Sequence, residues 1–139
     1  MQPNPAVVAD TRDWLETVAM DLESADSDLA HLPPILAGVV FHSQQAVEKV
    51  LKAFLTWNRQ PFPKTHDLAQ IGKQCVALDG SLLLLVERAV PLTPYAWRGR
   101  YPGDRVKPTL DEAMRALAIA KEVVDAVAAR IPLPPEPEG

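Results

Sequence analysis

Apolar residues recur at the spacing of α-helices along most of this chain, and prolines separate the helical stretches. The first series, with an apolar residue every three or four positions, consists of Trp14, Leu15, Val18, Leu22, Ala25 and Leu29. Asp10 or Thr11 is suited to cap this helix, and Pro33-Pro34 ends it. The pattern therefore predicts a long first helix behind a loose arm over residues 1–8.

The same pattern predicts two further helices in the middle of the chain. A long amphipathic stretch covers about residues 35–58. Prolines within Gln60–Lys64 exclude a helix there, so this segment is expected to be a loop. Thr65 is suited to cap a third helix, in whose first turn Asp67 would be favoured by the helix dipole. We expect this third helix to end near Leu78.

The C-terminal half repeats the alternation of helix and proline-rich connection. The leucine-rich stretch Ser81–Val90 lies between a glycine and a proline and is predicted to be a helix. Four prolines predict an irregular structure for residues 91–108. Thr109 and Glu112 have the spacing of a capping box, which opens a last helix to about Arg130.

Together these elements predict an all-α fold, an up-and-down bundle of four long helices plus a shorter one. A chain of 139 residues with 47% apolar residues is long enough for one ordinary domain with a hydrophobic core. We expect that single domain to cover residues 1–131. The proline-rich residues 132–139 are predicted to form a disordered tail.

Charge and cysteine content narrow the possible environments and partners. The net charge of −4 gives no overall positive field for nucleic acid, so anion binding would have to come from local clusters. The single cysteine, Cys75, cannot form an intrachain disulfide, and the first residues do not form a signal peptide pattern. No apolar run approaches the roughly 18 residues that span a membrane. We therefore expect a cytoplasmic protein without a membrane partner.

The second predicted helix carries a polar stripe. At about 100° per residue, one narrow arc of this helix contains His42, Gln45, Lys49 and Lys52. The opposite arc is apolar and would face a core, and it contains Val40, Val47, Val50, Leu51 and Phe54. An imidazole, an amide and two ammonium groups in one line are suited to an anionic ligand. The alternatives are a solvated polar face, a core-boundary position for His42 and an ion pair for Lys49.

A second candidate is His66, which the pattern places in the first turn of the third helix. An imidazole there could exchange a proton near neutral pH. The alternative is that Thr65 caps the helix, His66 packs, and the motif only fixes a turn.

The strongest local cluster of positive charge is the segment Trp97–Lys107. It contains three arginines and one lysine against one aspartate, interleaved with aromatic residues. This combination suits stacking on a base while guanidinium groups pair with phosphate. The alternative is that Trp97 and Tyr101 fill the space between helices and leave the arginines in solvent.

Other sequence patterns for small-molecule chemistry are missing. The chain has no P-loop and no glycine-rich dinucleotide fingerprint, so no cofactor is predicted. One cysteine and three scattered histidines do not have the spacing of a zinc site, and no metal is predicted. A Ser-His-Asp arrangement cannot be inferred either.

Three segments resemble motifs of the HEPN domain, a small helical module found in prokaryotes and higher eukaryotes. They occur in the family's order and are Phe41–Ala53, Lys64–Leu68 and Trp97–Asp104, the last similar to the family's Arg-Tyr-Pro turn. The resemblance implies a helical domain that binds a nucleotide or RNA, commonly as a dimer. It also implies a partner, a separately encoded minimal nucleotidyltransferase, in a pair that can act as toxin and antitoxin.

HEPN ribonucleases carry a catalytic Arg followed a few residues later by a His near the start of a later helix. Arg59 and His66 have a comparable spacing, but prolines interrupt the segment between them. No histidine follows Arg98, so the motif is missing from its expected place. The resemblance therefore favours a protein without ribonuclease activity.

The resulting hypothesis is a non-catalytic nucleotide- or RNA-binding module. We expect one shared cleft to be bordered by His42, Gln45, Lys49, His66, Arg100 and Tyr101. Arg98 is expected to bind the ligand as well. The first alternative is a metal-independent ribonuclease toxin, with His66 or His42 as general base and an arginine that stabilises the developing charge. The second alternative is a purely structural homodimer. The alanine-rich faces of the last helix support a dimer, through Ala113, Ala116, Ala120, Ala126 and Ala128.

Overall fold

A computed structural model of the protein describes residues 3–98, 102–103 and 107–136, and these residues contain helices but no strand. The all-α class is therefore confirmed. The α-helices are α1 (Pro5–Ala30), α2 (Leu36–Trp57), α3 (Leu68–Leu78), α4 (Leu83–Ala89) and α5 (Leu110–Ala128). Two 3₁₀-helices, η1 (Gly80–Leu82) and η2 (Val90–Ala96), precede and follow α4.

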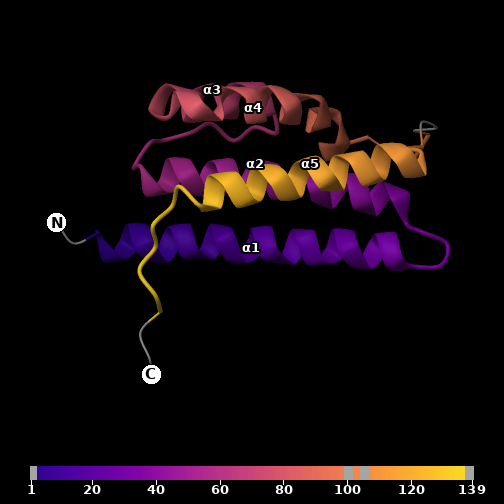
Figure 1. Cartoon of the computed structure of the whole chain (residues 1–139), viewed down its shortest axis with the longest axis horizontal. Coiled ribbons are helices and arrows are strands. Elements are labelled where there is room, and N and C mark those ends of the chain that lie inside the picture. The colour runs from indigo at the N-terminus through magenta and orange to yellow at the C-terminus, as the bar shows by residue number, and fades with distance from the viewer. Residues whose placement is uncertain (1–2, 99–101, 104–106, 137–139) are drawn as a thin grey trace.

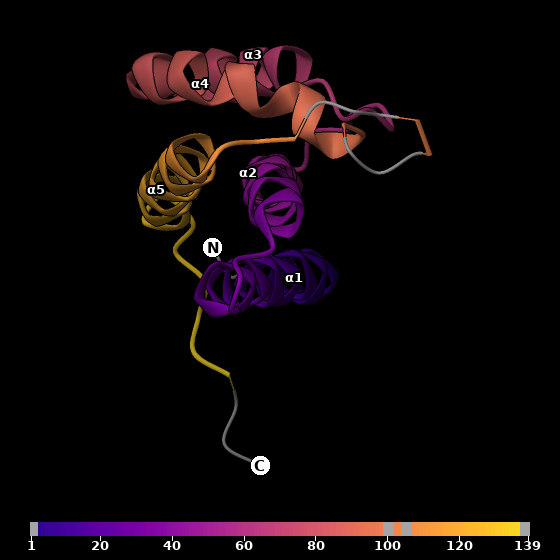
Figure 2. The same ribbon diagram turned by 90° about the vertical axis from the view of Figure 1, so that its right-hand side faces the viewer.

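Helix α2 lies at the centre of the bundle (Figures 1 and 2). Helix α1 runs antiparallel to it along one side, and α5 lies along a second side. The α3–α4 pair forms a layer on a third side of α2, away from α1. Helix α2 therefore contacts α1, α3, α5 and η2.

The first helix begins earlier than the sequence pattern predicts. Asn4 caps it, because its Oδ1 accepts a hydrogen bond from the Ala6 amide at 2.8 Å, and Pro5 occupies the first helical position, where its missing N–H costs nothing. The predicted cap Thr11 is buried inside α1, and its hydroxyl donates to the Val7 carbonyl. The expected loose arm is therefore wrong from residue 5 onward.

The start of α3 also differs from the prediction. Asp67, not Thr65, caps this helix, because the Asp67 carboxylate accepts from the Ala69 and Gln70 amides. The Thr65 hydroxyl instead accepts from the Asp67 amide at 3.0 Å. His66 thus lies just before α3. The sequence pattern places it in the first turn of this helix, and that prediction is wrong.

Part of the proline-rich stretch expected to be irregular forms η2. A 3₁₀-helix tolerates Pro91 at its start, and it buries Leu92 and Ala96 against the core. The predicted start of α5 at Thr109 is confirmed, because the Thr109 hydroxyl accepts from the Glu112 amide at 3.1 Å. The Glu112 carboxylate accepts from the Tyr95 hydroxyl at 3.3 Å.

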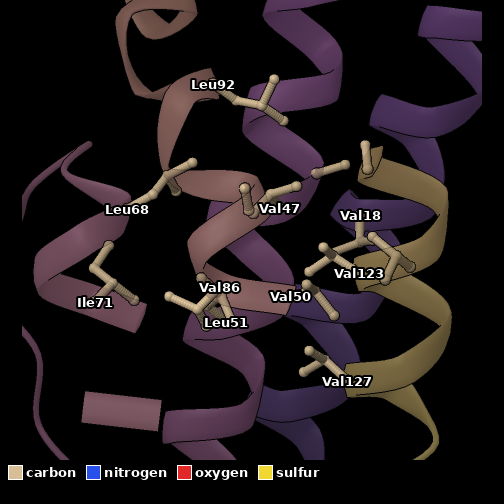
Figure 3. Close-up of a cluster of buried hydrophobic side chains, with 14 of the residues drawn as sticks. Val18, Val47, Val50, Leu51, Leu68, Ile71, Val86, Leu92, Val123 and Val127 are labelled. Atoms are coloured by element: carbon tan, nitrogen blue, oxygen red, sulfur yellow. The ribbon is translucent and has the colours of Figure 1, made fainter. Parts of the chain in front are cut away.

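The core collects around the apolar arc of α2 (Figure 3). Val47, Val50 and Leu51 of α2 are fully buried, with Val18 of α1 and Val123 of α5 on one side. On the other side, the α3–α4 layer contributes Leu68, Ile71 and Val86 to the same cluster, and η2 contributes Leu92. This arrangement confirms the predicted apolar arc of the helix.

After α5 the chain crosses the N-terminal part of α1. Ile131 is buried and Leu133 packs against the core. The Arg12 guanidinium donates to the Pro134 carbonyl at 2.7 Å and pairs with Glu136 at 3.4 Å. The disorder of the tail and the boundary at residue 131 stay predictions, and residues 137–139 lie outside the described residues.

Candidate functional site

The polar stripe of α2 meets carboxylates of the protein itself. Asp21 of α1 has only 9% of its side chain exposed and has two partners on α2. Its Oδ1 lies 2.8 Å from His42 Nδ1, and its Oδ2 accepts from Lys49 Nζ at 2.7 Å. We call Asp21, His42 and Lys49 the Asp21 unit.

A second unit with the same composition lies further along α2. Glu48 has 4% of its side chain exposed, and its Oε2 accepts from Lys52 Nζ at 3.0 Å. Its Oε1 lies 2.7 Å from Nδ1 of His66, which comes from the segment before α3. The same Oε1 accepts from the buried Gln44 amide at 3.1 Å. We call Glu48, Lys52 and His66 the Glu48 unit.

The hydrogen bonds of Glu48 decide its charge state. Burial alone would raise the pKa of this carboxyl group, because it removes the charged form from water. Hydrogen bonds from His66, Lys52 and Gln44 stabilise the carboxylate and outweigh burial, so the pKa of Glu48 lies below its ordinary value. Glu48 is therefore a buried anion at neutral pH.

The remaining polar groups of the stripe are also engaged inside the protein. The Lys52 ammonium lies 5.8 Å from the Trp14 ring centre and 5.7 Å from the Phe62 ring centre, and 11% of its side chain is exposed. The Gln45 side-chain amide donates to the side-chain Oε1 of Gln44 at 2.6 Å. Lys52 is therefore a structural cation within an aromatic contact.

The two imidazoles differ in their exposure. The His66 side chain is 58% exposed, whereas that of His42 is 28% exposed. His42 lines a surface hollow of about 430 Å³, whose other lining residues come from α1 and are Met20, Glu23, Ser24, Ser27 and Asp28. In both residues Nδ1 is held by a carboxylate. Because its side chain is more exposed, His66 is more open to a ligand than His42.

The end of η2 carries an exposed aromatic ring and an exposed guanidinium group, and η2 is hydrogen-bonded to the start of α3. The Thr93 hydroxyl of η2 accepts from the Leu68 amide at 3.3 Å, which joins η2 to the start of α3. Trp97 caps η2 with 46% of its surface exposed, and Arg98 is also exposed. His66 and Arg98 are thus carried by two segments that are hydrogen-bonded to each other.

A model of the HEPN domain family matches residues 11–131, which is most of the chain. The chain belongs to the HEPN family. The match includes α2, both carboxylate–imidazole units and η2, and it confirms the resemblance to this family. Comparison with curated proteins and with solved structures found no match. HEPN membership indicates a function related to nucleotides or RNA.

Within this HEPN domain the predicted site residues are only partly brought together. His42 and Lys49 share Asp21, while Gln45 and His66 are linked through Gln44 and Glu48. Arg100 and Tyr101 lie outside the described residues, so the shared cleft stays a prediction.

Sequence reasoning missed the two carboxylates and Gln44. The spacing of Glu48 and Lys52 is that of a helical i,i+4 ion pair and could have revealed one contact. Asp21 lies on another helix, 21 and 28 positions away from His42 and Lys49, and no local pattern links them.

The ribonuclease motif of other HEPN proteins is not reproduced by Arg59 and His66. Arg59 follows the end of α2 with a positive φ of 59°, and residues 58–67 contain no helix. The two side chains therefore do not lie on one helix face. In the described residues no group of three or more His, Cys, Asp or Glu side chains could hold a metal ion, and no helix is long and apolar enough to cross a membrane.

Proposed function

We propose that this HEPN protein is a non-catalytic module that binds a nucleotide or RNA. One observation carries the proposal: Trp97 and Arg98 are exposed at the end of η2, which the Thr93–Leu68 hydrogen bond holds beside the segment of His66. An exposed indole can stack on a base, and an adjacent guanidinium can pair with phosphate. Hydrogen bonds to a charged group contribute about 1.5–3 kcal/mol each when well made.

The cations of α2 contribute less to this surface than the sequence pattern predicts. Lys49 and Lys52 are each paired with a buried carboxylate, so their charge is already compensated. The positive charge available to a ligand comes instead from the segment that begins at Arg98. Because the net charge of −4 gives no overall positive field, anion binding depends on local positive charge such as that of this segment.

Binding of labelled single-stranded RNA and of a labelled nucleotide, measured by fluorescence anisotropy, tests the proposal. We expect Arg98→Gln to weaken binding about tenfold, the loss of one charge-assisted hydrogen bond. Arg88→Gln is the matched control, since Arg88 is an exposed arginine that pairs with Glu122 on the α4–α5 side. Equal binding by the parent and Arg98→Gln would contradict the proposed surface.

We further propose that the module acts with a separately encoded minimal nucleotidyltransferase, as a toxin–antitoxin-type pair. Membership of the HEPN family supports this pairing. The test is the neighbouring gene: a short nucleotidyltransferase reading frame is expected there, and its product should co-elute with this protein after co-expression. Separate elution of the two proteins would contradict the pairing.

A second candidate function is a metal-independent ribonuclease, favoured by the Glu48–His66 pair. A carboxylate that holds Nδ1 of an exposed imidazole orients the ring as a general base. Arg98 would have to stabilise the developing charge. We expect no cleavage of single-stranded RNA above background by the purified protein. Cleavage that disappears in His66→Ala or His42→Ala, with the fold intact, would place this function first.

A further inference from the structure

Arg98 and Arg115 are exposed arginines that form no ion pair within the part of the chain that the structure describes. Arg98 directly follows Trp97, and its backbone amide donates to the Pro94 carbonyl at 2.9 Å, which fixes where its side chain begins. Arg115 lies on the exposed side of α5. Other arginines are already compensated by carboxylates of the protein, namely Arg12, Arg88 and Arg130.

A hydrogen bond between η2 and α5 brings these two arginines to one surface. The Tyr95 hydroxyl donates to Glu112 Oε2 at 3.3 Å. Arg98 follows Tyr95 by three positions, and Arg115 follows Glu112 by three positions, the spacing of neighbours on a helix. Burial and Glu112 raise the pKa of Tyr95, and the positive charges of Arg98 and Arg115 oppose this rise. Both guanidinium groups therefore lie within electrostatic reach of the same phenol.

Glu112 is the carboxylate best placed to neutralise Arg115, because residues three apart on a helix can form an ion pair. It accepts from the Tyr95 hydroxyl instead, and among the described residues it pairs with neither arginine. The raised pKa of Tyr95 keeps its hydroxyl protonated at neutral pH, so it stays a donor to Glu112. Asp111, the other acidic residue in the first turn of α5, is favoured there by the helix dipole. Both guanidinium groups are thus left available to an anion.

We propose that Arg115 is a second phosphate-binding residue, and that the ligand is a single RNA strand that runs from the end of η2 onto α5. The proposal rests on the proposed binding function and narrows its ligand to a strand with several phosphates. Trp97 and Arg98 are adjacent and suffice for one base and one phosphate. Arg115 belongs to another element, so it contacts a further phosphate of the same strand. Tyr95 is a positioning residue, because it keeps Glu112 away from Arg115.

The experiment compares the affinity of the full chain for uridine monophosphate and for oligouridylates of increasing length, measured by competition in fluorescence anisotropy. Arg115→Gln should weaken binding of the longer oligouridylates about tenfold, through loss of one charge-assisted hydrogen bond. It should also reduce the slope of log affinity against log salt by about 0.7. Binding of uridine monophosphate, which has a single phosphate, should be the same as in the parent.

Lys121→Gln is the matched control for the change of charge. Lys121 lies on the same helix and its removal changes the net charge equally, but it is paired with Asp26 of α1. Its affinity and salt slope should equal those of the parent.

A double-mutant cycle tests the role of Tyr95. Tyr95→Phe keeps the ring but releases Glu112, so oligouridylate binding should weaken. Glu112→Gln should then strengthen binding more in the Tyr95→Phe background than in the parent. Equal effects in both backgrounds would show that Tyr95 has only a structural role and would overturn its positioning role.

The outcomes for Arg115 and for the binding function are distinct. Oligouridylate binding by Arg115→Gln that equals the parent's, or an equal loss for uridine monophosphate, would overturn the inference and leave the surface at Arg98 intact. Failure of the parent to bind any of these ligands would overturn the proposed function and the inference with it. Circular dichroism verifies the fold of each variant, and Arg115→Gln alone decides the outcome if Tyr95→Phe unfolds.

Discussion

Asp21 and Glu48 are the two side chains on which the polar face of α2 depends. Each is buried, and each holds one lysine and one imidazole through its two oxygens. A buried carboxylate that loses a partner keeps its desolvation cost and loses compensation. Substitutions of these residues should therefore lower the free energy of unfolding more directly than they change ligand binding.

The first prediction concerns Lys49. Lys49→Ala leaves buried Asp21 with His42 as its remaining side-chain partner. We expect the free energy of unfolding to fall by about 1–3 kcal/mol, the cost of an under-satisfied buried acceptor. Urea unfolding followed by circular dichroism measures it. Lys73→Ala, on the exposed surface of α3, is the control, and an equal effect of both variants would contradict the role of the Asp21 unit.

The second prediction concerns the stability of the protein in acid. The pKa of Glu48 in the folded protein lies below its ordinary value of 4.5, so its contribution to stability is present above that pH and is lost as the pH falls through the folded pKa. We expect the stability difference between the parent and Glu48→Gln to be largest near neutral pH and to shrink below about pH 4.5. Urea unfolding across this pH range measures it, and a constant difference would contradict the prediction.

At the level of residues, the sequence located the stripe but not its partners. The helical spacing of His42, Gln45 and Lys49 is a local property and could be read directly from the chain. The Asp21 contact depends on how α1 packs against α2, which no local pattern encodes. The lysines of the stripe therefore suggested an anionic ligand, whereas in the structure they pair with the protein's own carboxylates, Asp21 and Glu48.

At the level of elements, the α3–α4 layer depends on a close approach at Gly72. A Cβ atom at this position would lie 2.4 Å from a methyl carbon of Val86 on α4. Both residues are buried, so neither helix can move away without exposing core. The glycine thus sets the separation of the two helices.

The third prediction follows from this contact. Gly72→Ala should lower the free energy of unfolding by about 1–3 kcal/mol, because overpacking forces side chains or helices to shift. Gly80→Ala is the control, since no atom lies within 4 Å of its added Cβ. The double variant Gly72→Ala with Val86→Ala should lose less than the sum of the two single variants. Strict additivity in denaturant unfolding would contradict the proposed contact.

The helices were predictable wherever one local signal dominates. Thr109 with Glu112 placed the start of α5, and Pro33-Pro34 separated α1 from α2. The start of α1 was missed because Asn4 with Pro5 is a shorter signal than the apolar series that follows it. The helix η2 was missed because its prolines also fit an irregular chain, and only the burial of its side chains against the core stabilises the 3₁₀ form.

At the level of the whole molecule, the alanine-rich side of α5 is used inside the domain. Ala113, Ala116 and Ala120 are buried in the core of the same chain, while Ala126 and Ala128 are half-buried. The close approach that these residues allow therefore serves α5 and its neighbours, and most of the alanine face is not free for a second chain.

The fourth prediction is the oligomeric state, which rests on the HEPN family and not on the alanines. We expect a homodimer at micromolar concentration. Light scattering coupled to size-exclusion chromatography gives the mass directly. A monomer mass would contradict the dimer and leave the binding surface at Arg98 as a property of the single chain.

The pairing of the α2 lysines with buried carboxylates also has a consequence for counterions. For single-stranded nucleic acid, each phosphate neutralised by a protein cation contributes about −0.7 to the slope of log affinity against log salt. Lys49 and Lys52 are neutralised within the protein and release no ions from the RNA. The slope should therefore be shallow, and Arg98→Gln should reduce it by about 0.7. Salt would then weaken RNA binding far less than the number of lysines and arginines in the sequence implies.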